Sequence, residues 1–382
     1  MATKAEVIIV GAGPGGLAVA GQLRRRNISF QLLERGDGVG YSWRHHYDRL
    51  HLHTVKEFSH LPDFPFPDDY PRYVPKDELV NYYEAYAREQ QLLPLFNCTV
   101  KQIEPTAAGW QVTTTDGRSF AAPAVVLATG MNRIPFRPHL AAEEDYEGRI
   151  LHSADYQNPA PFAGQRVLVV GMGNSGAEIA LDLAEHGVDT SISVRGAVNI
   201  VPREIFGRPT QVSALLLAKL PNWLGDRIGL LVRRFTVGDL PRYGLQLPAM
   251  SPARQLRELG QTPVIDLGTL DYIRSGQIQV LPGIDHCTEE GVMCKDGELY
   301  NFDSIIMATG FRAQVEELAP AAKDSLDVHG MPTSPIGRGA CRGLYFVGFN
   351  NYAPGGTLGI IRGEAEQVAE HLAQARAAGK VA

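Results

Sequence analysis

The sequence predicts an α/β fold in which one strand–helix–strand unit is inserted into another. Each unit begins with a short apolar run that leads into a glycine-rich turn, GAGPGG at 11–16 and GMGNSG at 171–176. A helical pattern and a second apolar run follow each turn, and a later apolar run in each unit ends in Ala-Thr-Gly, at 128–130 and 308–310. This arrangement is typical of dinucleotide-binding domains, so we expect two Rossmann-like domains.

Length and composition restrict the class of protein. The 382 residues suffice for two to three domains, and 44% hydrophobic with 20% charged residues is an ordinary globular mixture. The net charge is −6 without a basic run, which argues against nucleic-acid binding. The four cysteines form no CxxC pair and have no zinc-ligand spacing. We therefore expect free thiols in a cytoplasmic protein, no metal site and no membrane-spanning segment.

The first unit has every part of a dinucleotide fingerprint. Its strand at 7–10 leads into the glycine turn, the helix follows at 17–26, and the second strand at 28–33 ends at Glu34. Gly11 permits the turn, Gly13 lets the backbone approach a pyrophosphate, and Gly16 lets the helix pack on the strand. Glu34 is expected to accept hydrogen bonds from ribose hydroxyls. The rival interpretation is a tight connection between strand and helix without a ligand.

The second unit differs at its strand end. Its strands are expected at 167–170 and 190–194, and Arg195 stands where the first unit has Glu34. A guanidinium binds a ribose 2′-phosphate that a carboxylate would repel, which favours NADPH over NADH. The alternative is that Arg195 merely solvates the strand end. The residues expected to bind NADPH are Gly171, Gly173, Asn174, Ser175, Gly176 and Arg195.

The spacing of the repeated motifs predicts that the second unit interrupts the first. We expect residues 1–150 and 284–382 to form the first dinucleotide-binding domain and residues 151–283 to form the second, the NADPH-binding domain. An apolar insert at about 202–263 interrupts the second domain. Phe206, Trp223, Phe235 and Tyr243 lie in this insert and are expected to form an apolar wall for the substrate. The alternative is that the insert packs against a second subunit, which would give a homodimer, or against a membrane surface.

Two dinucleotide units in one chain imply two cofactors that exchange a hydride, of which FAD and NADPH are the usual pair. An N-terminal first unit commonly binds FAD, so residues 1–150 and 284–382 are expected to be the FAD-binding domain. Disulfide reductases share this plan, but they need a redox dithiol, and this chain has no CxxC motif. The reduced flavin must therefore pass its electrons elsewhere, and O2 is the obvious acceptor.

Several stretches resemble the flavin-containing monooxygenase family. Residues 146–156, YEGRILHSADY, are similar to its FxGxxxHxxxY/F fingerprint, with Tyr146 in place of the first Phe. The resemblance narrows to the YUCCA-type enzymes over nearly the whole chain. The matching stretches are LER at 33–35, YDRLHLH at 47–53, PFP at 65–67, GNSGAEIALDLAEHG at 173–187, VPREIFG at 201–207, YGLQLP at 243–248 and TPVIDLGTLDYIRSG at 262–276.

The resemblance implies a monooxygenase in which NADPH reduces FAD and O2 then forms a flavin 4a-hydroperoxide. YUCCA-type enzymes use it for oxidative decarboxylation of indole-3-pyruvate to indole-3-acetate, the hormone auxin, so the implied substrate is a small aromatic or apolar molecule. Three alternatives stay open: oxygenation of sulfur or nitrogen, a peroxide-releasing NADPH oxidase, and a non-catalytic flavoprotein.

The resemblance also implies roles for individual residues. Ser42 and Trp43 would lie along the flavin; the alternative for Trp43 is a core aromatic. His53 and Thr54 would contact the flavin and nicotinamide; His53 is the candidate catalytic residue, with a structural histidine as the alternative. Gly348 is the expected backbone contact in the C-terminal turn. The residues expected to bind FAD are Gly11, Gly13, Pro14, Gly15, Gly16, Glu34, Arg35, Ser42, Trp43, His53, Thr54, Ala128, Thr129, Gly130 and Gly348.

Overall fold

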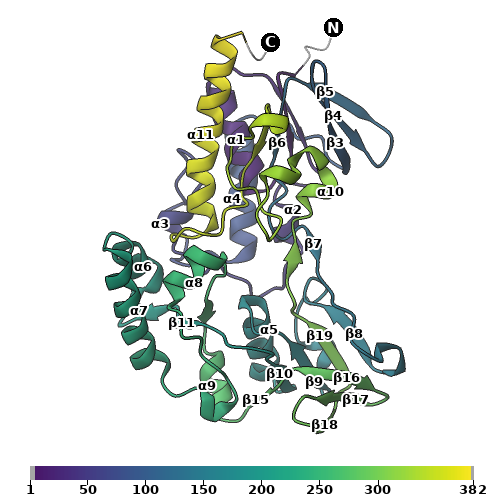
Figure 1. Cartoon of the computed structure of the whole chain (residues 1–382), viewed down its shortest axis with the longest axis vertical. Coiled ribbons are helices and arrows are strands. Elements are labelled where there is room, and N and C mark those ends of the chain that lie inside the picture. Colours follow the sequence, from purple (N-terminus) through teal and green to yellow (C-terminus); the bar gives the residue numbers. More distant parts are fainter. Residues whose placement is uncertain (1–4, 380–382) are drawn as a thin grey trace.

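The computed structural model describes residues 5–379, which form two lobes stacked along the long axis of the molecule (Figure 1). Both ends of the described chain lie in the upper lobe, and the middle of the sequence builds the lower lobe (Figure 1). Each lobe has a parallel sheet with helices on it. This confirms the predicted α/β class and the insertion of one unit into the other.

The upper lobe is built on a four-stranded parallel sheet in the order β2-β1-β6-β21. Alternate side chains of β1 enter two different cores: Val7 and Ile9 pack among the helices, whereas Ile8 and Val10 pack toward the β3–β5 meander. The elements are β1 (Val7–Val10), β2 (Phe30–Leu33), β6 (Ala124–Leu127), β21 (Leu344–Phe346), α1 (Pro14–Arg25), α4 (Lys76–Glu89), α11 (Thr357–Ala377), β3 (Val100–Thr106), β4 (Gly109–Thr114) and β5 (Ser119–Ala122).

The lower lobe repeats this plan with a five-stranded parallel sheet in the order β15-β10-β9-β19-β8. Val167 and Val169 of β9 face the helices, and Leu168 faces the β16–β18 meander. The elements are β8 (Arg149–His152), β9 (Arg166–Val170), β10 (Asp189–Ser193), β15 (Ile278–Leu281), β19 (Ser304–Met307), α5 (Asn174–Glu185), α9 (Thr269–Arg274), β16 (Ile284–Thr288), β17 (Gly291–Cys294) and β18 (Leu299–Asn301).

The lower lobe extends beyond the boundaries predicted from the sequence. β8 begins at Arg149 and β19 ends at Met307, and both pair within the second sheet. The β16–β18 meander, assigned to the first domain by the prediction, packs its Cys287 and Val292 against Leu168 of this lobe. We therefore propose a second domain over 149–310. The chain passes between the lobes at β7 (Ile134–Pro135) and β20 (Phe311–Arg312), which pair antiparallel.

The insert forms a helical layer beside the lower sheet (Figure 1). It lies between β11 (Ile200–Pro202) and β14 (Val264–Asp266), which pair in parallel. It contains the hairpin β12 (Glu204–Ile205) and β13 (Arg208–Pro209), followed by α6 (Thr210–Leu217), α7 (Asn222–Val237) and α8 (Pro252–Leu259). All four cysteines of the chain are buried and unpaired. In the described part of the chain, we find no helix with the length and apolar character needed to cross a membrane.

Candidate functional site

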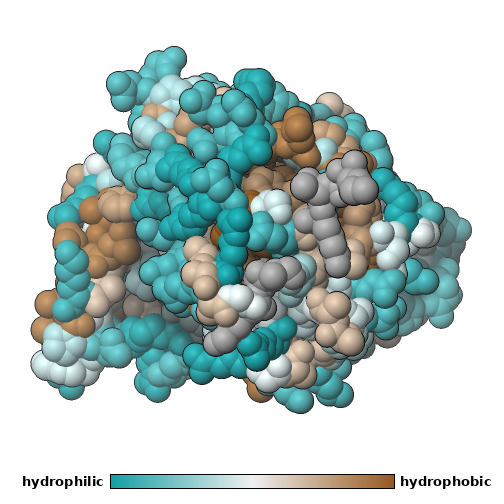
Figure 2. All heavy atoms as spheres, turned by 90° about the horizontal axis from the view of Figure 1, so that it is seen from above, coloured by the Kyte–Doolittle hydropathy of each residue, from teal (hydrophilic) through white to brown (hydrophobic). Residues whose placement is uncertain are grey.

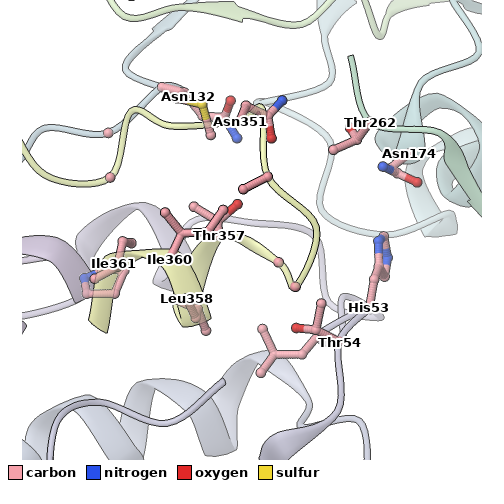
Figure 3. A pocket seen from close by; sticks show the side chains of 18 of the residues that line it. His53, Thr54, Asn132, Asn174, Thr262, Asn351, Thr357, Leu358, Ile360 and Ile361 are labelled. Carbon is pink, nitrogen blue, oxygen red and sulfur yellow. The ribbon is translucent and has the colours of Figure 1, made fainter. Parts of the chain in front are cut away.

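A cavity of about 1370 Å³ lies between the upper lobe, the lower lobe and the insert. This exceeds the roughly 300–1,000 Å³ of a typical small-molecule pocket, so it has room for more than one ligand. Figure 3 shows His53 pointing toward Asn174 of the lower lobe, while Thr357 and Ile360 enter from the start of α11. The cavity therefore brings together segments from the beginning, the middle and the end of the chain.

The first glycine loop has the geometry that the sequence predicts. Gly11 has φ +102°, and a Cβ there would lie 2.7 Å from the carbonyl oxygen of Ala128. A Cβ on Gly16 would lie 1.8 Å from the carbonyl oxygen of Gly11. Gly13 is different, because a Cβ there would meet nothing within 4 Å and the residue lines the cavity. Gly11 and Gly16 are thus required for packing, whereas Gly13 leaves open space next to the N-terminus of α1.

Glu34 is buried and held by the glycine loop itself. Its Oε2 accepts a hydrogen bond of 2.6 Å from the backbone N–H of Ala12, and its Oε1 accepts one of 2.9 Å from Gly36. A carboxylate has about four lone-pair sites, so two remain for hydroxyl donors of a ligand. The neighbouring Arg35 is exposed at the cavity, and its guanidinium lies 5.5 Å from the ring centre of Tyr41.

The structure gathers nearly all the residues predicted to bind FAD around this one cavity. Gly16 is the exception, since it packs under the loop. Ser42 and Trp43 lie on α2 (Tyr41–Arg44), and Trp43 also contacts the cores of both lobes. The predicted residues in the lining are Gly11, Gly13, Pro14, Gly15, Glu34, Arg35, Ser42, Trp43, His53, Thr54, Ala128, Thr129, Gly130 and Gly348.

Thr129 and Gly348, two residues of this lining, differ in their capacity to bind a dinucleotide. The hydroxyl of Thr129 is buried and has no hydrogen-bond partner, although its residue lines the cavity. Such a group favours a ligand that supplies the missing partner. The backbone N–H of Gly348 already donates a hydrogen bond of 2.9 Å to the carboxylate of the buried Glu364 in α11. It is therefore not available for the predicted contact with a ligand. Burial raises the pKa of that Glu364 carboxyl. The open space at Gly13, the spare acceptors of Glu34 and the Thr129 hydroxyl fit a bound dinucleotide.

The second glycine loop repeats the backbone of the first. Gly171 has φ +102°, and a Cβ there would lie 2.8 Å from the carbonyl oxygen of Ala308. A Cβ on Gly176 would lie 1.9 Å from Gly171, and one on Gly173 would meet nothing within 4 Å. Asn174 lines the cavity, and its Oδ1 accepts a hydrogen bond of 2.7 Å from the N–H of Ile265. Ser175 is half-buried beside the Tyr47 hydroxyl. The other predicted NADPH residues lie outside the cavity lining.

The strand register corrects one detail of the prediction. Val10 pairs with Leu33, and Val170 pairs with Ser193, so the residue equivalent to Glu34 is Val194, which is buried. Arg195 is equivalent to Arg35 and is exposed. The predicted equivalence is wrong because the expected second strand extends one residue too far. The second loop therefore lacks a carboxylate at this place, and its guanidinium stands one position later.

A buried carboxylate that the prediction missed connects the two lobes. Glu178 of α5 is 2% exposed. Its Oε2 lies 3.1 Å from His53 Nε2 and accepts a hydrogen bond of 2.9 Å from the Tyr47 hydroxyl. Because a carboxylate is an acceptor, it fixes the Nε2 proton of His53 on the side of the lower lobe. Burial, together with Glu178, holds the pKa of Tyr47 well above its usual range. Glu178 thus orients His53, but no sequence pattern pairs residues 125 positions apart.

Gln211 of α6 is a second residue that the prediction missed. Its Oε1 accepts a hydrogen bond of 2.8 Å from the N–H of Val55, and its Nε2 donates one of 2.5 Å to the carbonyl oxygen of Gly355. One side chain of the insert therefore holds both the loop after His53 and the C-terminal glycine turn. A lone glutamine on an apolar helix gives no sequence signal for this role.

The aromatic wall predicted for the insert is wrong in most of its members. Phe206 lines the cavity, but Trp223 and Phe235 are 62% and 80% exposed and lie outside its lining, and Tyr243 packs with the core of the lower lobe. The insert lines the cavity with smaller apolar side chains instead, among them Ala214, Leu217 and Leu256. Aromatic content alone does not tell which face of a helix turns inward.

Comparison with known proteins places the chain in a family. The model of the family "Flavin-binding monooxygenase-like" matches residues 4–324. The indole-3-pyruvate monooxygenase YUCCA1 of Oryza sativa subsp. japonica is 41% identical over 351 residues, which cover 90% of this chain and 86% of the relative. The probable indole-3-pyruvate monooxygenase YUCCA3 of Arabidopsis thaliana is 39% identical over 356 residues, covering 90% and 81%.

Solved structures show the same fold. The flavin-containing monooxygenase of Stenotrophomonas maltophilia has a TM-score of 0.74 at 22% identity, covering 97% of this chain and 98% of that one. The cyclohexanone monooxygenase of Rhodococcus sp. Phi1 has a TM-score of 0.72 at 19% identity, covering 98% and 85%. The extent of the family match and the identity to the plant relatives show that this chain belongs to the flavin-binding monooxygenase-like family and is a flavoprotein monooxygenase.

Proposed function

We propose that this enzyme binds FAD at the first glycine loop and NADPH at the second, and that it converts an aromatic 2-oxo acid such as indole-3-pyruvate into the acid one carbon shorter. The observation that carries the proposal is the single cavity, which joins the first glycine loop to the apolar insert and to Asn174 of the second loop. The names of relatives at 39–41% identity supply the substrate class.

The residues of the chain have distinct tasks in this reaction. The N–H groups around Gly13 would bind the diphosphate of FAD, and the carboxylate of Glu34 would bind its ribose. FAD, when bound, would supply the activation of O2. Ala214, Leu217 and Leu256 exclude water from the reacting groups. Glu178 keeps the ring of His53 in place at the cavity wall.

The overall reaction sets what must be measured. One oxygen atom of O2 enters the new carboxylate, the other leaves as water, the original carboxylate leaves as CO2, and NADPH supplies the two electrons. The test is O2 uptake by the purified holoenzyme with NADPH and a panel of compounds, followed by product mass. We expect indole-3-pyruvate to stimulate uptake and to yield indole-3-acetate with one CO2 per NADPH.

Other outcomes identify other activities. If O2 uptake responds to a thioether or an amine but to no 2-oxo acid, the enzyme oxygenates sulfur or nitrogen and does not decarboxylate. Uptake that is the same with and without every compound, with hydrogen peroxide as product, would identify an NADPH oxidase. Absence of NADPH consumption under all conditions would leave a non-catalytic flavoprotein.

A further inference from the structure

Large apolar side chains are exposed mainly on the insert. Among the described residues, eleven large apolar side chains are exposed, and eight of them lie between residues 206 and 259. These eight are Phe206, Leu216, Leu220, Trp223, Leu231, Val232, Phe235 and Leu259. Exposed apolar residues scattered singly need no explanation, but a concentration on one segment marks an interaction surface.

The exposed side chains of α7 fall on one face of the helix. Trp223, Leu231 and Phe235 are spaced by eight and four residues, which places them on one side at 3.6 residues per turn. Arg227 and Arg234 lie on the same side, and the Arg227 guanidinium is 5.6 Å from the ring centre of Trp223. We call these five residues the α7 outer face. Gly225 and Gly229, on the other side of the helix, line the cavity.

The charge of the insert is opposite to that of the rest of the molecule. Residues 202–263 hold nine arginine and lysine residues and four acidic residues, a formal charge of +5. The remainder of the chain has 27 basic and 38 acidic residues, a formal charge of −11. In the described part of the chain, Lys219, Arg227 and Arg234 are exposed and form no salt bridge. The basic groups of this surface are thus free for an anionic partner.

We infer that the α7 outer face docks on the surface of an anionic phospholipid bilayer. Aromatic and leucine side chains interleaved with arginines are the composition of helices that lie in a membrane interface, where the apolar groups enter the lipid and the guanidiniums remain at the headgroups. Figure 2 shows apolar and polar atoms side by side at the left-hand end of the molecule, where α6 and α7 lie in Figure 1. Two copies of this chain joined through the same face would instead bring like charges together.

The test is flotation of the FAD-loaded full chain with vesicles of phosphatidylcholine alone or with 30–40% phosphatidylglycerol (roughly the anionic content that gives a strong surface potential). We expect binding to the anionic vesicles, loss of binding in high salt, and little binding to phosphatidylcholine. Each basic side chain near an anionic surface contributes about fivefold to partitioning. The double variant Arg227→Glu/Arg234→Glu should therefore bind at least about 25-fold more weakly.

A fluorescence measurement reports on the same face independently. Of the three tryptophans, Trp110 is buried and Trp43 is half-buried, whereas Trp223 is 62% exposed. Anionic vesicles should shift the emission to shorter wavelength in the native chain and leave it unchanged in Trp223→Phe. Phe235→Ser should weaken flotation. The matched control Val328→Ser, which replaces a 95% exposed apolar residue outside the insert, should bind like the native chain.

Two results would overturn the inference. The first is a chain that stays with the buffer in the presence of anionic vesicles at low salt. The second is a dimer in sedimentation velocity that Phe235→Ser dissociates, without any flotation; the face would then be an interface between copies. Neither readout depends on enzymatic activity, so the outcome is independent of the proposed substrate.

Discussion

The two glycine loops have the same backbone and different surroundings. Gly11 and Gly171 share φ +102°, and a Cβ on either would lie within 2.8 Å of the carbonyl oxygen of the alanine in the corresponding Ala-Thr-Gly turn. The first loop closes on a buried carboxylate, Glu34, whereas the second has Val194 at that place. We therefore propose that the backbone of the loop specifies a diphosphate site and that the end of the next strand specifies which nucleotide occupies it.

The largest effect should come from breaking the first loop without disturbing its packing. Gly13→Val points its side chain into open space, so the fold should persist, while a ligand diphosphate loses its approach to the backbone. A hydrogen bond to a charged group contributes about 1.5–3 kcal/mol, so losing two should lower flavin affinity by at least about a hundredfold. Flavin absorbance after gel filtration measures this.

The matched variant Gly173→Val is the control, because a Cβ at Gly173 also meets open space. In the flavin-free form it should unfold at the same temperature as Gly13→Val, and as purified it should remain yellow. If Gly13→Val keeps its full flavin content, the first loop is not the FAD site.

Arg195→Ala tests whether the guanidinium that follows Val194 binds the 2′-phosphate of NADPH. Loss of one charge-assisted contact of about 1.5–3 kcal/mol should raise the Michaelis constant for NADPH roughly 10–150-fold. The constant for NADH should change little, because NADH has no 2′-phosphate. Steady-state kinetics with both cofactors measure the ratio. An equal change for both would show that Arg195 has a structural role.

Glu178→Ala tests whether the buried carboxylate of the lower lobe positions His53 at the cavity wall. The substitution leaves the donors of His53 and Tyr47 without their acceptor, which costs about 1–3 kcal/mol in the free energy of unfolding. Product formed per NADPH should fall, because His53 is released at the cavity wall. Glu178→Gln retains an acceptor oxygen and should restore most of the coupling. If the alanine variant couples as well as the native chain, Glu178 does not position His53.

The smallest effect should be that of pH on the stability of the lower lobe. His152 is buried, and burial lowers its pKa below the usual 6.5. The unfolded chain therefore binds a proton at a higher pH than the folded chain, so the free energy of unfolding should decrease as the pH falls through about 6.5. Chemical denaturation at about pH 7 and about pH 5.5, on either side of that value, measures the difference. His152→Gln should reduce it; an unchanged pH dependence would assign the effect to other groups, such as His46.

The local parts of the site are predictable from the sequence. The glycine loops, Glu34 and the Ala-Thr-Gly turns depend on backbone geometry within one strand–helix–strand unit, which leaves a clear pattern. Contacts between distant segments leave none. Glu178 and Gln211 act on loops 125 and 156 residues away, and the lower lobe includes a meander that no local pattern assigns to it. The prediction for Trp223 and Phe235 is wrong because the aromatic content of a helix does not show which of its faces turns toward the cavity.

The assignment of one cofactor to each loop is tested most directly by anaerobic reduction of the flavin, followed by absorbance in native enzyme and in Gly173→Val. The native enzyme should be bleached rapidly by NADPH and slowly by NADH. Gly173→Val should keep its flavin, resist NADPH, and still be bleached by dithionite. Reduction of Gly173→Val by NADPH at the native rate and concentration dependence would show that the second loop does not hold the nicotinamide cofactor and would contradict the assignment.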